Sequence, residues 1–278
     1  MRSPEIDLVR IRGIDLPLDE LVNFELFEST VCSSLRERLL HALPFPHLVL
    51  DQVFNAALLN LVWEEFDHFA DDDWKTHADS YKNTSRSMMG AKLGPASQLY
   101  FDVVNSGWFT EWISSITNVP YLLPDPKLLG GGLHESKTGG RFAVHSDFRY
   151  HRILGLQNEM VFITYLNKDW RPEWNGALEL WDRKRKKCEI SIQPEFGRSV
   201  LMLHSSVSFH GHPTPLSMPN GKTRRSIAAY YYTSPYMDEP SEYEAGSNFL
   251  LTGRLHKLKT VTKMLTPPLL WSAVRRLK

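Results

Sequence analysis

The chain has 278 residues, 42% of them hydrophobic and 12% aromatic, which is enough to bury the core of one large β-type domain. Lys plus Arg and Asp plus Glu are balanced at 32 each, so no global charge favours nucleic acid as a partner. Two cysteines give neither a disulfide framework nor a zinc pattern, and no apolar run reaches the length of about 18 residues that a membrane span needs. We therefore expect a cytoplasmic protein without a transmembrane segment.

The first part of the chain is expected to support the core with helices. Residues 1–45 are interpreted as an N-terminal extension and residues 46–125 as a helical support region. Apolar residues at helical spacing after Asp51 predict a helix that Asp51 caps, and a second helix is expected over residues 106–116. The polar stretch between them, residues 70–95, is expected to be a loop or an active-site lid.

From Leu128 onward the sequence consists of short apolar or alternating runs separated by turn residues. Eight runs rich in Val, Ile, Phe and Tyr predict antiparallel strands packed as a sandwich or jelly roll; they are LLGGGLHES, RFAVHSD, MVFITYL, ALELWD, EISIQP, SVLMLHS, SFHGH and RSIAAYYYT. Helices before strands indicate an α+β fold, with residues 126–236 as the catalytic core. Residues 237–278 form a basic tail, interpreted as a solvated helix or as a contact with an anionic substrate, partner or membrane surface.

One strand of this core carries the pattern of a metal site. In RFAVHSD, His145 and Asp147 are two residues apart and therefore project from the same face of a strand. Two histidines and one carboxylate form the facial triad of non-haem iron, which leaves positions open for other ligands. A second His-x-Asp pair, His77 and Asp79, lies in the polar region without strand alternation and is the weaker candidate.

The third ligand has to come from a later histidine. His204, His210 and His212 are the candidates, and His210 and His212 share a face if SFHGH is a strand. Gly211 between them would allow close approach of the backbone to a metal or ligand. We assign His210 as the ligand, with His204 as a core histidine and His212 in a supporting role.

The strand that follows carries an anion-binding pattern. Arg224 and Ser226 open RSIAAYYYT on one face, with Arg225 on the other, and a planar guanidinium can pair both oxygens of a carboxylate. Tyr230, Tyr231 and Tyr232 are interpreted as alternating core and surface. Residues expected near the mouth of the site are the candidate substrate contacts: His134, Arg149, Tyr150 and His151.

In this order, HSD, YLNKDW, the distal histidine and R-x-S resemble the 2-oxoglutarate/Fe(II) dioxygenase superfamily and its prolyl-4-hydroxylase-like branch. IQPEFGRSVLML is similar to that branch's strand before the distal histidine, and the motifs span residues 128–235. The resemblance implies a double-stranded β-helix, Fe(II), 2-oxoglutarate as co-substrate and ascorbate as reductant. It also implies that Tyr165 and Arg224 bind the 2-oxoglutarate tail, with Ser226 beside them.

The implied reaction is hydroxylation or desaturation of an aliphatic C–H bond in a small-molecule, amino-acid or peptidyl substrate, with release of succinate and CO2. Asp147 argues against halogenation, because halogenating relatives carry a small residue at that position. Arg149 after Phe148, and Ala177 after Gly176, depart from the pattern of related enzymes and leave the substrate open. The alternatives are a cupin-like binding protein without turnover and a jelly-roll metal-dependent hydrolase.

Overall fold

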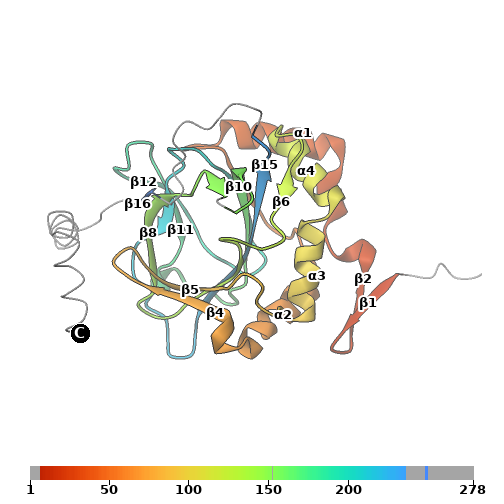
Figure 1. The fold of residues 1–278 in the computed structure, drawn as a ribbon, viewed down its shortest axis with the longest axis horizontal. Coiled ribbons are helices and arrows are strands. Elements are labelled where there is room, and N and C mark those ends of the chain that lie inside the picture. The colour runs from red at the N-terminus through yellow and green to blue at the C-terminus, as the bar shows by residue number, and fades with distance from the viewer. Residues whose placement is uncertain (1–6, 152, 236–247, 250–278) are drawn as a thin grey trace, which may run out of the picture.

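A strongly curled antiparallel sheet forms the centre of the computed structural model, which describes residues 7–151, 153–235 and 248–249. One side of the curl has the strand order β12-β11-β14-β8, the other has β7-β15-β10-β13-β3, and β5 joins β8 to β7. The two sides face each other (Figure 1), and residues from both sides line one cavity. This is the expected double-stranded β-helix core of an α+β fold.

The sheet has fourteen strands within the described ranges. They are β3 (His47–Leu50), β4 (Trp74–Ala78), β5 (Lys82–Ser87), β6 (Leu123–Pro124), β7 (Gly132–Ser136), β8 (Arg141–Ser146), β9 (Tyr150–His151), β10 (Leu156–Tyr165), β11 (Leu178–Trp181), β12 (Cys188–Ile192), β13 (Ser199–Leu203), β14 (His210–His212), β15 (Arg224–Thr233) and β16 (Asn248–Phe249). The eight runs expected as strands correspond to β7, β8 and β10 to β15. A separate hairpin precedes the sheet, β1 (Leu8–Ile11) and β2 (Ile14–Pro17).

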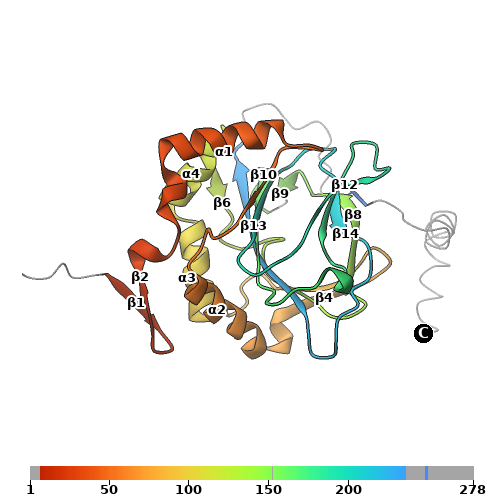
Figure 2. The ribbon, with the colours of Figure 1, turned by 180° about the vertical axis from the view of Figure 1, so that it is seen from behind.

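Helices cover the side of the sheet that carries β10, β13 and β15 (Figures 1 and 2). They are α1 (Ser29–His41), α2 (Ala56–Glu65), α3 (Pro95–Val104) and α4 (Gly107–Thr117), with short 3-10 turns at Leu18–Glu20, Phe24–Phe27, Phe66–His68, Asp71–Asp73 and Pro172–Trp174. None of the described helices is long and apolar enough to cross a bilayer.

Capping side chains explain where two of these helices begin. Asn55 accepts a hydrogen bond from the Ala57 amide at the start of α2, so the expected cap at Asp51 is wrong by one turn. Ser106 caps α4, which confirms the second expected helix within one residue at each end. The first turn of α3 has no cap of its own, and buried Glu65 of α2 accepts its amides instead.

The alternation of β10 and β15 decides what faces the cavity. On β10, Met160 and Phe162 pack against the helices, whereas Val161, Ile163 and Tyr165 line the cavity. On β15, the even-numbered residues from Arg224 to Tyr230 line the cavity, and the odd-numbered residues from Ile227 pack toward the helices. Both faces are buried, which accounts for the near-continuous apolar character of these two strands.

Three other expectations can be compared with the structure. Residues 70–95, expected as a loop or lid, contain the β4–β5 hairpin, and β5 is a full member of the sheet. Tyr231 and Tyr232 are fully buried and Tyr230 lines the cavity, so the expectation that the tyrosines alternate between core and surface is wrong. The basic tail, residues 237–278, lies outside the described residues except for β16, which pairs with β8.

Candidate active site

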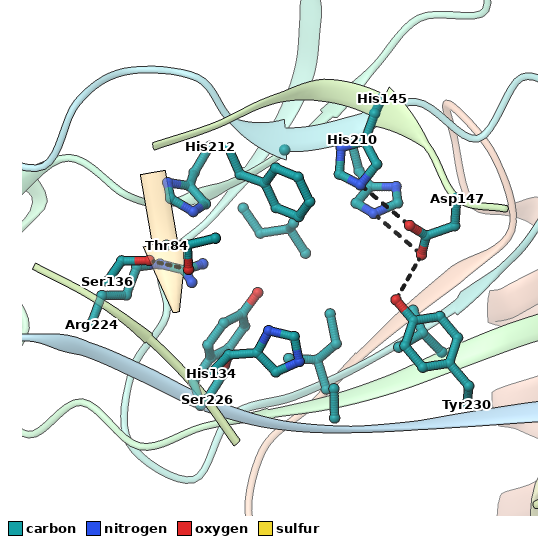
Figure 3. Close-up of a pocket in the computed structure, with 17 residues that line it drawn as sticks. Thr84, His134, Ser136, His145, Asp147, His210, His212, Arg224, Ser226 and Tyr230 are labelled. Carbon is teal, nitrogen blue, oxygen red and sulfur yellow. Dashed lines mark hydrogen bonds and ion pairs between the residues drawn. The ribbon is translucent and has the colours of Figure 1, made fainter. Parts of the chain in front are cut away.

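Adjacent antiparallel strands bring His145 and His210 together. In the register of β8 and β14 the two residues are direct partners, and their ring centroids lie 4.5 Å apart. Asp147 follows two residues after His145, just past the end of β8. Ligand atoms of the three side chains all lie within 4.8 Å of one another, and all three residues are buried (Figure 3).

Backbone carbonyls orient both imidazoles. His145 donates from Nδ1 to the Ala143 carbonyl at 2.9 Å, and His210 donates from Nδ1 to the Ser208 carbonyl at 3.1 Å. Because a carbonyl oxygen only accepts, each ring carries its proton on Nδ1 and presents the Nε2 lone pair to the centre. Burial, followed by the charge of His145, lowers the pKa of His210 to about 4, which keeps the ring neutral at physiological pH.

Asp147 is held as a carboxylate by its neighbours. Burial by itself would raise its pKa, but contacts with His145, His204 and His210 hold the pKa well below the ordinary value. The Tyr230 hydroxyl donates to Oδ2 at 3.0 Å, and Nε2 of His204 lies 3.2 Å from the same oxygen. The carboxylate is therefore both charged and fixed in orientation.

Gly211 has a role different from the one its sequence position indicates. A Cβ at this position would lie 2.8 Å from the Phe142 carbonyl oxygen and 3.0 Å from that of Ala143. Glycine thus allows β14 to approach the backbone of β8, rather than approaching a metal. The consequence is still functional, because this close pairing sets the separation of His145 and His210.

The donor set fits a divalent transition metal. Two imidazole nitrogens and one carboxylate oxygen converge in a buried pocket, as a facial triad requires. His212 also lines the pocket but does not belong to this group, and neither does His204. The structure therefore brings together the three residues that the sequence singled out and leaves His204 and His212 out of the group.

Arg224 lies at the other end of the cavity from this group (Figure 3). It is buried, its Nε donates to the Gly176 carbonyl at 2.7 Å, and its guanidinium carbon lies 5.0 Å from the ring centroid of Tyr165. No carboxylate of the described residues forms an ion pair with it. Burial lowers the pKa of Arg224, which is the signature of a cation that lacks its counter-charge.

Small polar groups surround the guanidinium end of the cavity. Ser136 donates to Thr84, and Ser226 and His212 line the same end. Nδ1 of His212 and Nε2 of His134 are buried without a hydrogen-bond partner among the described residues. Burial, then the charge of Arg86, lowers the pKa of His134 to about 4, so this ring is a neutral hydrogen-bonding group. Such unpaired atoms fit a polar ligand in the cavity.

The four candidate substrate contacts divide into two groups. His134 lines the cavity, whereas Arg149, Tyr150 and His151 are not among the residues that line it. Arg149 donates to the His204 carbonyl. His151 is fully buried, accepts the Leu154 amide on Nδ1 and lies 3.1 Å from an Asp125 oxygen, which makes it a structural residue. The weaker metal candidates, His77 and Asp79, lie on and just after β4, and Asp79 accepts amides of its own turn.

Tyr230 is the site residue that the sequence interpretation missed. Its hydroxyl contacts Asp147, and its position follows from the same two-residue period that places Arg224 and Ser226 in the cavity. The β-propensity of three consecutive tyrosines says nothing about which of them faces the cavity. Counting in steps of two from Arg224 along the strand does, because it places Tyr230 on the cavity face. His204 and Thr84 carried no comparable signal, because the first ends an apolar run and the second lies in a polar hairpin.

Comparison with known proteins agrees with this geometry. Residues 131–232 match the model of the 2OG-Fe(II) oxygenase superfamily. This part of the chain therefore has the features of a 2-oxoglutarate/Fe(II) oxygenase core. Its cofactor and co-substrate are therefore Fe(II) and 2-oxoglutarate. No curated protein sequence matches the chain.

Solved structures share the fold of the oxygenase. A Pseudomonas putida prolyl-4-hydroxylase is 14% identical with a TM-score of 0.51, over 72% of this chain and 98% of its own. A Trichoplax adhaerens prolyl hydroxylase, solved with a hypoxia inducible factor oxygen degradation domain peptide fragment, is 12% identical with a TM-score of 0.51, over 73% and 90%. A Burkholderia pseudomallei 2OG-Fe(II) oxygenase family oxidoreductase is 10% identical with a TM-score of 0.54, over 72% and 90%.

Proposed function

We propose that this oxygenase hydroxylates an aliphatic C–H bond of a small-molecule or peptidyl substrate in the cytoplasm. His145, Asp147 and His210 would hold Fe(II), while Arg224, Tyr165 and Ser226 would hold 2-oxoglutarate. The observation that carries the proposal is Arg224, a buried cation without a carboxylate partner in the described chain, across one cavity from a buried two-histidine, one-carboxylate group. When bound, the iron supplies the centre for oxygen activation, and 2-oxoglutarate supplies two electrons and leaves as succinate and CO2.

The chain's own residues bind and orient the reactants. Arg224 pairs with the far carboxylate of 2-oxoglutarate, and the Tyr165 hydroxyl stays protonated, because burial raises its pKa. Apolar side chains exclude water between the two ends of the cavity; they are Phe142, Val161, Ile163, Leu178 and Ala228. Halogenating relatives carry a small residue at the position of Asp147, which leaves room for a halide. Here the carboxylate of Asp147 fills that room. This supports hydroxylation over halogenation.

Succinate release tests the reaction class. Purified protein with Fe(II), ascorbate and 2-oxoglutarate is expected to release succinate slowly even without a prime substrate. His145→Ala and His210→Ala should abolish both metal binding and succinate release, while circular dichroism shows an intact fold. His77→Ala is the matched control, since it removes an imidazole from the other His-x-Asp pair and should change neither.

The same assay decides between the alternatives. A cupin-like binding protein or a jelly-roll hydrolase would bind metal through the same triad but release no succinate from 2-oxoglutarate. Product analysis by mass spectrometry separates hydroxylation, which adds one oxygen atom, from desaturation, which removes two hydrogen atoms. Retention of iron by His145→Ala or His210→Ala would contradict the ligand assignment.

A further inference from the structure

Two cations of β5 lie on either side of Thr84, a residue that lines the cavity. Lys82, Thr84 and Arg86 alternate with Asn83 and Ser85 and so project from one face of the strand. Thr84 lines the cavity, which identifies this face as the inner one. Across the strand pairs, Arg86 is the partner of His134.

Lys82 is the corresponding partner of Phe142 on the other neighbouring strand. Both Phe142 and His134 line the cavity, and paired residues of antiparallel strands project to the same side. The ammonium nitrogen of Lys82 lies 5.6 Å from the ring centroid of Phe142. Lys82 and Arg86 therefore flank the cavity where β5 bridges its two walls.

The charges of Asp79 and Asp147 act on Lys82, but neither cation has a direct ion-pair partner within the part of the chain that the structure describes. No ion pair of Lys82 or Arg86 occurs there. The nearest acidic residue in sequence, Asp79, accepts the amides of Tyr81 and Lys82 in the hairpin turn. Burial and then the charges of Lys82 and Arg86 lower the pKa of His77 to about 4, which indicates a positive local field.

The position of Arg86 differs from that of Arg224. Along β15 and β7, Arg224 pairs with Ser136 and Ser226 pairs with His134, so Arg86 lies two residues further along the cavity. That direction leads on to Tyr230, whose hydroxyl contacts the metal-site carboxylate. Along the sheet, Arg86 thus lies between Arg224 and the metal centre, on the β5 flank of the cavity.

A second group of cations follows β11, the strand that pairs with β14 of the metal site. Leu180 of β11 pairs with His210, and the turn that follows β11 contains five consecutive cations, residues 183–187. Arg185 of this turn lies 4.0 Å over the ring of Phe209, next to the metal-site histidine. Because the whole chain has a formal net charge of zero, this concentration of positive charge is local.

We propose that the prime substrate is an anion whose carboxylate or phosphate group is bound by Arg86, with Lys82 beside it. The proposal rests on the proposed function above, because it places this group in the same cavity as 2-oxoglutarate. The cations at residues 183–187 attract such a substrate to the mouth, and Arg86 then orients it by charge-assisted hydrogen bonds. A guanidinium suits this role because its planar fork matches both oxyanions.

The test uses inorganic phosphate as the probe and calorimetry as the readout. The full chain is loaded with stoichiometric Mn(II) in place of Fe(II), saturated with 2-oxoglutarate so that Arg224 is occupied, and titrated with phosphate at constant ionic strength. Arg86→Gln should weaken phosphate binding at least about tenfold, the value of one charge-assisted hydrogen bond. Arg86→Lys should recover part of the loss, and Lys92→Gln, which removes an exposed cation outside the cavity, should change nothing.

A second titration, with 2-oxoglutarate alone, separates the possible outcomes. Unchanged 2-oxoglutarate affinity in Arg86→Gln together with lost phosphate binding supports the proposal. Equal loss of both assigns Arg86 to the co-substrate and overturns it. Phosphate binding that requires Mn(II) but survives Arg86→Gln marks a metal ligand only and also overturns it. A wild-type chain that fails to bind 2-oxoglutarate refutes the proposed function instead, which keeps the two failures distinct.

Discussion

Arg224→Met is expected to weaken 2-oxoglutarate binding strongly without destabilising the ligand-free protein. The hydrogen bond of Arg224 to Gly176 uses Nε, which leaves the terminal nitrogens to pair with a carboxylate. Two charge-assisted hydrogen bonds at the low end of about 1.5–3 kcal/mol each amount to roughly 3 kcal/mol. That corresponds to a Kd raised at least about a hundredfold.

The stability of the ligand-free protein should change in the opposite sense. Arg224→Met removes a buried cation with no carboxylate partner among the described residues, so a desolvation cost of several kcal/mol disappears. Against this stands the loss of the hydrogen bond to Gly176, about 1 kcal/mol, and of the contacts with Tyr165. The free energy of unfolding is therefore expected to stay equal or to rise.

Thermal unfolding of the Mn(II)-loaded protein measures both effects. At a 2-oxoglutarate concentration of about 100 Kd, the wild-type protein gains about 2.7 kcal/mol, whereas a variant with a hundredfold weaker Kd gains only about 0.4 kcal/mol. At roughly 2–4 °C per kcal/mol, the ligand-induced rise in Tm is about 5–11 °C for wild type and about 1–2 °C for the variant.

Arg225→Met is the matched control, since it changes the adjacent arginine on the opposite face. Arg225 pairs with Asp67 and with Glu135, and neither of these carboxylates lines the cavity. Its loss should lower stability by about 1–3 kcal/mol, because the partly buried Glu135 loses its partner, and should leave the 2-oxoglutarate shift intact. A full shift in Arg224→Met, or a lost shift in Arg225→Met, would refute the assigned roles.

Two further predictions concern the metal centre and the response to pH. Tyr230→Phe removes the donor to Asp147 and should weaken Mn(II) affinity about 10- to 100-fold in a metal titration, with secondary structure unchanged. His134 has a folded-state pKa of about 4, below the unfolded value of about 6.5, so the stability that it contributes is present above pH 6.5 and is lost as pH falls toward 4. His134→Asn should therefore flatten the acid limb of a urea-unfolding series by up to about 1.4 kcal/mol per pH unit between these values, and an identical limb in both proteins would contradict the assignment.

The metal centre was predictable because its signals are local. A two-residue period on a strand places His145 and Asp147 on one face whatever the rest of the fold does. Three histidines lie within nine residues, and the choice of His210 over His204 depended on SFHGH being a strand and on His204 ending an apolar run. Only the register of β14 against β8 gives the physical reason, because it makes His210 the direct partner of His145.

The β4–β5 hairpin was not predictable because its residues have weak strand signals. Lys82 to Ser87 are almost entirely polar, and one face lines the cavity while the other is partly exposed, so hydrophobic alternation is lacking. The start of α2 was misplaced for a related reason. Asp51 and Asn55 are both good caps, and the packing of Phe54 and Leu58, rather than cap chemistry, decides between them.

The charges in the cavity explain why the metal and the co-substrate should bind together. Asp147 and Arg224 contribute one negative and one positive charge to the cavity, and Fe(II) and 2-oxoglutarate add equal and opposite charges. Either ligand alone leaves the buried site with excess charge, which a low-dielectric interior penalises. We therefore expect each to raise the affinity of the other. Lys82 and Arg86 are left out of this balance, which is why an anionic group on the prime substrate is the complement that the cavity lacks.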